Sequence, residues 1–280
     1  MTITSAPSVE FIPVDVGRGQ TSSGHAGDGD GPLNVFVHGY RSMTSASQVE
    51  AARSRVASLG LPGRSRLMNW ASGRWRDSAA VAGLRAAYRV ARLRNVLTPW
   101  MLLVDAGVVG LAEVAQFKWM ERRAERLGRE LGPLLQREAD GATVNMIGHS
   151  LGARVIHRLL AEMSRRGSGP ADPRIGDVVL LGGAADLEAD NWPDCVRRID
   201  GRLFNAYSPR DRILKITPDL RRRVGGRPMK PCVVDGIEKV INQRFDRVSH
   251  VDYWTRLDEL LPEIWPPDSR HIAAGATTQQ

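Results

Sequence analysis

The chain has 280 residues, of which 42% are hydrophobic and 25% are charged, and its formal net charge is +8. This length can bury the core of one large α/β domain. The two cysteines, Cys195 and Cys232, exclude a disulfide framework and a cysteine-rich metal site, and they can be two free thiols or one bridge. Neither GxxxxGK nor GxGxxG occurs, which excludes the common nucleotide-binding enzymes.

The positive charge comes almost entirely from arginine, because only four of the 39 basic residues are lysine. The arginines alternate with acidic residues, as in the run WMERRAERLGRE at 119–130, and no RNA-binding signature or zinc spacing accompanies them. We therefore expect no nucleic-acid partner, while peripheral contact with an anionic membrane stays open. The oligomeric state is not indicated.

Three regions are expected along the chain. Residues 1–32 should form an N-terminal strand and a flexible linker rich in Gly, Ser and Asp, residues 33–266 one α/β domain, and residues 267–280 a loose tail. The N-terminus has neither the basic nor the apolar segment of a secretory signal peptide. A cytoplasmic location is the expectation, with export by another route left open.

Short apolar strands alternate with helices in the central region. Strands are predicted at 33–39, 65–70, 143–148, 177–183 and 202–207, with a last strand or hairpin at 231–241. Helices are predicted at 45–59, 78–139, 151–166 and 252–265. The strands are apolar throughout rather than alternating, which is typical of a parallel sheet covered on both faces. The pattern predicts the α/β class.

The helical region contains an apolar stretch over 95–117 of roughly membrane-spanning length. Pro99, Asp105 and Glu113 interrupt it, and acidic side chains are costly in the centre of a bilayer. We expect a buried or cap helix inserted between two sheet strands. A lid that contacts lipid and a true membrane span are the alternatives.

The segment VNMIGHSLG places Ser150 between Gly148 and Gly152, directly after a predicted strand and before a predicted helix. This is the arrangement of a nucleophile elbow, in which a sharp turn exposes a serine hydroxyl. The flanking residues must be small for the chain to double back. The start of the helix also supplies free N–H groups beside the hydroxyl.

A serine needs a base and an acid to act as a nucleophile, and in elbow enzymes the acid and then the histidine follow it along the chain. Of the downstream histidines, His157 lies on the helix after the serine and His271 in the loose tail, so His250 is the expected base. Asp211 follows a predicted strand and is the expected acid. Asp186 follows the preceding strand and is the alternative, whereas Asp252 is too near His250 in sequence and can instead cap a helix.

An oxyanion hole is the third requirement. One donor should be the main-chain N–H of Leu151, which follows the nucleophile. The second should come from the loop after the strand at 33–39, through the N–H of Tyr40 or Arg41, with Gly39 allowing a tight turn. His38 is expected to shape this loop rather than to act as a second base.

These motifs occur in a characteristic order: VFVHGYRS, MIGHSLGARVI, DVVLLGGAAD, NAYSPRDRIL and SHVDYW. Their succession resembles the α/β-hydrolase superfamily, and more narrowly the hydrolase domain of transmembrane-and-coiled-coil-type proteins, a poorly characterised group with bacterial members. The resemblance covers roughly residues 33–260 and is weak over 71–140. It implies a mostly parallel sheet of about eight strands flanked by helices, a helical insert near 78–139 before the elbow, and a triad of Ser150, Asp211 and His250. The chain lacks a clear membrane-spanning pair, so membrane anchoring is not carried over.

The expected activity is that of a serine hydrolase that cleaves a carboxylic ester of a small molecule or lipid through an acyl-enzyme, as in an esterase or lipase. No metal or organic cofactor is expected. Acyl transfer or thioester cleavage would use the same triad, because one fold supports several reactions. A non-catalytic module that binds anionic membranes is the alternative outside the enzymes.

Overall fold

The computed structural model describes residues 9–14, 31–40, 43, 45–70, 99–167, 169, 172–216 and 222–270. For residues 99–116, 216, 269 and 270 it describes the main chain alone. Residues 17–30 of the predicted linker, 78–98 of the predicted helical insert and 271–280 of the predicted tail lie outside the described residues.

A seven-stranded sheet forms the centre of the molecule, in the order β1-β3-β2-β4-β5-β6-β9. The strands are β1 (Val9–Val14), β2 (Leu33–Val37), β3 (Arg64–Trp70), β4 (Val144–His149), β5 (Ile175–Leu181), β6 (Leu203–Tyr207) and β9 (Val240–Arg244). Only β1 runs antiparallel to its neighbour in this sheet. Every residue of β2, β4 and β5 is buried, as expected for central parallel strands. The fold is that of an α/β-hydrolase, with seven strands described where the resemblance implied about eight.

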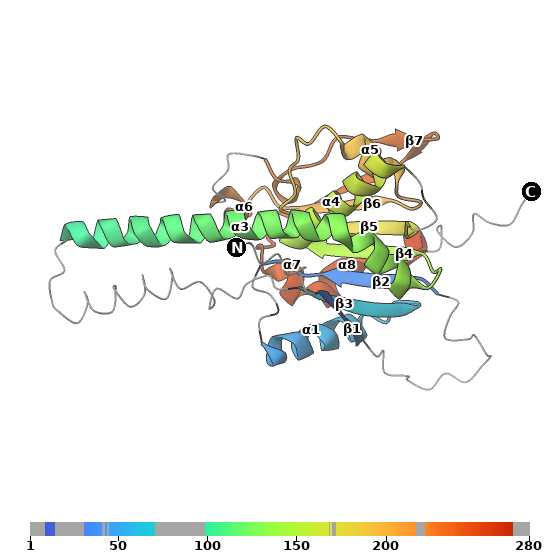
Figure 1. Ribbon diagram of the computed structural model, residues 1–280, viewed down its shortest axis with the longest axis horizontal. Coiled ribbons are helices and arrows are strands. Elements are labelled where there is room, and N and C mark those ends of the chain that lie inside the picture. Colours follow the sequence, from blue (N-terminus) through green and yellow to red (C-terminus); the bar gives the residue numbers. More distant parts are fainter. Residues whose placement is uncertain are drawn as a thin grey trace, which may run out of the picture.

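Helices cover both faces of this sheet. They are α1 (Ala46–Ser58), α3 (Pro99–Ala139), α4 (Leu151–Arg166), α5 (Trp192–Arg197), α6 (Arg212–Ile216), α7 (Asp252–Thr255), α8 (Leu257–Ile264) and α9 (Pro267–Arg270), with a short 3₁₀ turn η2 (Val224–Gly226). Figure 1 shows α3 crossing one face of the sheet, while α1, α7 and α8 lie on the other side.

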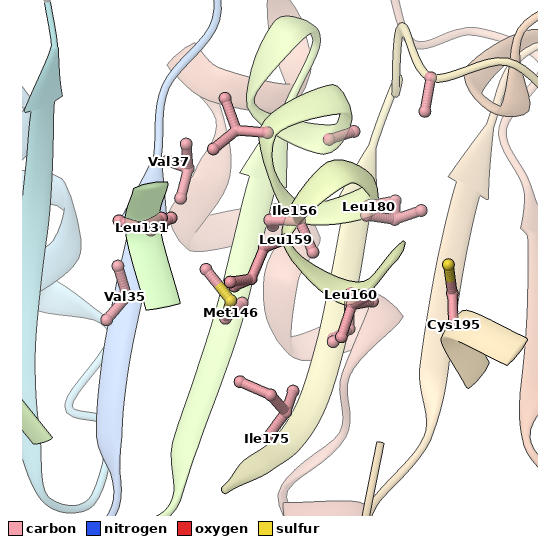
Figure 2. Close-up of a cluster of buried hydrophobic side chains, with 14 of the residues drawn as sticks. Val35, Val37, Leu131, Met146, Ile156, Leu159, Leu160, Ile175, Leu180 and Cys195 are labelled. Carbon is pink, nitrogen blue, oxygen red and sulfur yellow. The ribbon is translucent and has the colours of Figure 1, made fainter. Parts of the chain in front are cut away.

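Two apolar clusters explain this layering. Alternate side chains of the strands point to opposite faces, so Val35 and Met146 enter the cluster beneath α3 and α4, whereas Phe36 and Ile147 enter the cluster beneath α1 and α8. Figure 2 shows the first cluster, in which Leu159 of α4 lies over Met146 of β4. Burial of these clusters on both faces provides the main driving force for the fold.

The helix α3 is continuous from Pro99 to Ala139, where the sequence predicted an insert, and its second half packs against α4. Gly128 permits close approach of the two helices, because a Cβ there would lie 2.5 Å from the carbonyl oxygen of Val155. None of the helices in the described part of the chain has the length and hydrophobicity needed to cross a bilayer.

The C-terminal third differs in detail from the prediction. The segment expected to be a last strand or hairpin contains both: a hairpin of β7 (Val233–Val234) and β8 (Ile237–Glu238), followed by β9. Its turn uses positive φ angles at Asp235 and Gly236, which favour a tight hairpin. The single helix predicted over 252–265 is divided into α7 and α8, because Arg256 leaves the helical conformation.

The order of the strands places a topological switch between β2 and β4. From β2 the chain continues to β3 on one side, and from β4 it continues to β5 on the other side. In open α/β sheets, ligands bind outside the carboxyl ends of the strands at such a point. The loops that follow β2 and β4 carry Tyr40 and Ser150, so the predicted oxyanion loop and elbow are neighbours.

Candidate active site

The turn between β4 and α4 holds Ser150 in a strained conformation, with φ 53° and ψ −116°. A non-glycine residue rarely adopts a positive φ, and such strain is typical of functional sites. A Cβ at Gly148 would lie 2.9 Å from the main-chain nitrogen of Ala153, and one at Gly152 would lie 2.0 Å from the carbonyl oxygen of Val37. Both flanking positions therefore need glycine for the strand, the turn and the helix to meet.

Three side chains from distant parts of the chain form one hydrogen-bonded series. Nε2 of His250 lies 2.8 Å from Oγ of Ser150, and Nδ1 of His250 lies 2.7 Å from Oδ2 of Asp211. An ionised carboxylate only accepts hydrogen bonds, so Nδ1 is assigned as the donor and Nε2 is left to accept from the serine hydroxyl. All three residues are buried. The arrangement is that of a Ser-His-Asp triad.

The carboxylate of Asp211 is held by its own local structure. Its Oδ1 accepts a hydrogen bond of 3.1 Å from the main-chain N–H of Leu214, in the first turn of α6. Its own N–H donates to the carbonyl oxygen of Ser208. The loop after β6 therefore directs the second carboxylate oxygen at the imidazole of His250.

The alternative site residues have other partners. The carboxylate of Asp186 accepts from the main-chain N–H of Glu188, and that of Asp252 accepts from the N–H of Ser249. The imidazole of His157 lies 3.1 Å from the amide oxygen of Asn191. His271 and Arg41 lie outside the described residues.

The loop after β2 runs directly against Ser150. A Cβ at Gly39 would lie only 2.7 Å from Cβ of Ser150. The next residue, Tyr40, is half-buried and packs edge-on against Phe117 of α3. Leu151 opens α4 and is fully buried beside Ser150. The two expected oxyanion donors, the main-chain N–H groups of Tyr40 and Leu151, thus belong to segments on either side of the serine.

His38 supports this loop from within the protein. Its Nδ1 donates to the carbonyl oxygen of Gly39 over 2.8 Å, and its ring stacks on Trp70. Burial lowers the pKa of His38 to about 4, so the ring is neutral at pH 7. The indole of Trp70 donates in turn to the carbonyl oxygen of His38.

His149, the residue between Gly148 and the nucleophile, was not identified as a site residue from the sequence. Its Nε2 donates to the carbonyl oxygen of His250 over 2.9 Å, and its ring stacks on Trp254. Burial, with the nearby His250 as a smaller cause, lowers the pKa of His149 to about 3. The signal was present in the two motifs GHSLG and SHVDYW, but only the structure shows that they touch.

The described residues contain no group of His, Cys, Asp and Glu side chains that could hold a metal ion. Cys195 and Cys232 are both free thiols, which decides between the two alternatives that the sequence left open. Burial raises the pKa of the Cys195 thiol to about 12, so this group is not a reactive thiolate.

Several proteins of known structure resemble the chain at low identity. An esterase domain from Rhodothermus marinus is 14% identical, with a TM-score of 0.37 and 91% and 97% of the two chains covered. An esterase from Pyrobaculum calidifontis is 12% identical, with a TM-score of 0.39 and 95% and 83% covered. Neither likeness indicates an activity for this chain.

Two curated relatives match part of the chain. An uncharacterised membrane protein of Caenorhabditis elegans is 31% identical over 148 residues, which are 51% of this chain and 23% of that protein. The transmembrane and coiled-coil domain-containing protein STS1 of rice is 34% identical over 96 residues, which are 34% of this chain and 14% of that protein. The chain thus matches less than a quarter of the length of either relative. Both are eukaryotic proteins, so they give no support to a bacterial assignment. Residues 93–265, more than half of this chain, match the family described as protein of unknown function DUF726, and the chain belongs to that family.

Proposed function

We propose that the protein is a serine hydrolase that cleaves a carboxylic ester through an acyl-enzyme formed on Ser150. The hydrogen-bonded series from Ser150 through His250 to Asp211 is the observation that carries this proposal. The strained elbow and the helix that begins at Leu151 support it, because they aim the serine hydroxyl at the rim of the sheet.

In the acylation step, Nε2 of His250 takes the proton of the Ser150 hydroxyl while Oγ forms a bond to the ester carbonyl carbon. Asp211 stabilises the imidazolium that results. The N–H groups of Leu151 and Tyr40 stabilise the negative charge that develops on the carbonyl oxygen. The tetrahedral intermediate collapses when the carbon–oxygen bond to the alcohol breaks, and His250 returns the proton to the leaving alkoxide.

In the deacylation step, water replaces the alcohol. His250 takes a proton from water as the hydroxide oxygen attacks the acyl carbon, and the second collapse returns the proton to Oγ of Ser150. Products are one carboxylic acid and one alcohol. An acceptor other than water would give a transferred acyl group by the same steps, and product analysis distinguishes the two outcomes.

Labelling with a fluorophosphonate probe tests the proposal directly. Wild-type protein should become labelled and should hydrolyse p-nitrophenyl esters, and Ser150→Ala should lose both properties while keeping its circular dichroism spectrum. Ser164→Ala is the matched control, because Ser164 lies in the last turn of α4 and its hydroxyl donates to the main-chain carbonyls of Leu160 in α4 and Asp194 in α5. Unchanged turnover in Ser150→Ala would refute the proposal.

A further inference from the structure

Large apolar side chains are exposed beside the two triad residues that come from loops. Among the described residues, five such side chains are exposed: Trp119 (52%), Ile213 (46%), Val233 (63%), Ile237 (51%) and Val251 (53%). Ile213 lies two residues after Asp211 in α6, and Val251 directly follows His250. Single exposed apolar residues are ordinary, but apolar residues gathered at a functional rim mark an interaction surface.

The part of this rim around Ile213 is positively charged, whereas Asp252 follows Val251 on the other part. Arg210, Arg212 and Lys215 are exposed around Ile213, while Asp211, the acidic residue of this segment, is buried against His250. On α3, the guanidinium of Arg123 lies 5.4 Å from the ring centre of the exposed Trp119. We call Ile213, Val251, Arg210, Arg212 and Lys215 the catalytic rim.

The first half of α3 extends beyond this rim. Figure 1 shows the helix passing the edge of the sheet that carries α6 and α7 and projecting past it. The projecting sequence over 99–117 is largely apolar, and its only charged residues are Asp105 and Glu113. At the base of the projection, Phe117 contacts Tyr40 of the predicted oxyanion loop. A helical segment of largely apolar sequence therefore extends past the end of the sheet that carries α6 and α7.

We propose that the catalytic rim docks on the surface of an anionic lipid bilayer and presents Ser150 to ester bonds of membrane lipids. Exposed apolar side chains can enter the boundary between headgroups and acyl chains, while arginine and lysine pair with lipid phosphates. The net charge of +8 favours such a surface over a neutral one. The choice of lipid esters as substrates rests on the proposed hydrolase function, whereas docking itself does not.

The hairpin β7–β8 provides an internal comparison. It carries the exposed Val233 and Ile237, but it directly precedes β9, whose first residue pairs with the first residue of β6. The hairpin therefore lies at the amino ends of the parallel strands, away from the triad, as Figure 1 also shows. Val233 and Ile237 of the hairpin are about as exposed as Ile213 and Val251 of the catalytic rim, but they lie away from the triad.

Vesicle co-sedimentation tests docking without any need for turnover. Wild-type protein should bind vesicles of phosphatidylcholine with 30% phosphatidylglycerol at least tenfold more tightly than vesicles of pure phosphatidylcholine. Addition of 0.5 M NaCl should weaken this binding strongly, because salt screens the attraction between opposite charges. Ile213→Asp with Val251→Asp should reduce binding at least tenfold, and Arg210→Gln with Lys215→Gln should remove the preference for phosphatidylglycerol.

Residues for matched controls lie at the other end of the sheet, near the amino ends of the parallel strands. The double variant Val233→Asp with Ile237→Asp changes apolar residues that are as exposed as Ile213 and Val251. The double variant Arg165→Gln with Arg166→Gln removes two exposed charges at the C-terminal end of α4. Both double variants should bind vesicles as tightly as the wild-type protein. Equal loss in rim and control variants, or no binding by wild-type protein, would overturn the docking inference. Loss of binding accompanied by a change from dimer to monomer in size-exclusion chromatography would also overturn it, because a second copy would then cover the rim.

Activity measurements separate this inference from the proposed function. The rim variants should lose at least tenfold more activity on an ester presented in anionic vesicles than on a soluble short-chain ester. A wild-type protein that binds vesicles and cleaves no ester would refute the hydrolase proposal and leave docking standing. A wild-type protein that cleaves soluble esters and binds no vesicles would refute docking and leave the hydrolase proposal standing.

Discussion

The imidazole of His149 donates a hydrogen bond of 2.9 Å to the main-chain carbonyl of His250, so the residue before Ser150 holds the segment that carries His250. Stacking of His149 on Trp254 adds a second contact to the same segment. The two histidine rings lie 5.1 Å apart. The buried His149, whose lowered pKa leaves it neutral at pH 7, therefore helps to position the imidazole of His250 beside Ser150.

His149→Leu should lower kcat of ester hydrolysis by about 10- to 100-fold with little change in KM, because small displacements of a catalytic group are costly. Trp254→Phe keeps an aromatic ring over His149 and should lose much less activity. Steady-state kinetics and thermal melts of both variants check this. Equal activity in His149→Leu and wild type would contradict a positioning role.

Asp211→Asn should reduce kcat by about 10⁴-fold, the size of effect known for the corresponding change in a serine protease, because an amide cannot hold the required tautomer of the histidine. Asp186→Asn is the matched control, since its carboxylate accepts from the N–H of Glu188, whereas the imidazole of His250 bonds Asp211. We expect near wild-type turnover from the control. If Asp186→Asn were the inactive variant instead, the acid would be misassigned.

Ser150→Gly should make the protein more stable than Ser150→Ala by about 1–2 kcal/mol, although both lose activity. The reason is the φ of 53° at this position, which glycine adopts without the strain that any Cβ suffers. Urea denaturation of the two variants measures the difference. Equal stability would mean that the elbow stores no strain at Ser150.

Stability should fall as the pH is lowered from 6.5 to 5. Burial lowers the pKa values of His38, His149 and His157 to about 4, 3 and 4 in the folded protein. In the unfolded chain, the same histidine side chains have a pKa near 6.5. The unfolded state therefore binds more protons in this window, and each histidine costs up to roughly 1.4 kcal/mol per pH unit.

Urea midpoints at pH 7 and pH 5 check this dependence. His157→Gln removes one of the three buried imidazoles at a site away from the triad, where the ring stacks on Trp192. The pH dependence of this variant should be weaker by about one third, in proportion to the groups removed. A flat stability profile in the wild-type protein over this range would contradict the buried neutral histidines.

Local sequence was sufficient to place the elbow and the class of fold. The pattern Gly-x-Ser-x-Gly after an apolar strand suits few local structures other than a sharp strand-to-helix turn. In that turn, main-chain atoms beside Gly148 and Gly152 leave no room for a Cβ. The alternation of buried strands and helices likewise predicted the parallel sheet, since fully apolar strands need cover on both faces. The central strands β2, β4 and β5 follow that pattern, whereas β1, β3 and β9 are only partly buried and β1 runs antiparallel to β3.

Only the tertiary structure decided which carboxylate faces His250 and what His149 does. Asp186 and Asp211 follow neighbouring strands in the same way, so spacing along the chain could rank them but not place them. The order of the strands, with β6 beside β9, brings the loop after β6 to the segment of His250. His149 and Trp254 meet across more than a hundred residues because separate elements pack together. Such contacts depend on the arrangement of the whole sheet, which no short stretch of sequence contains.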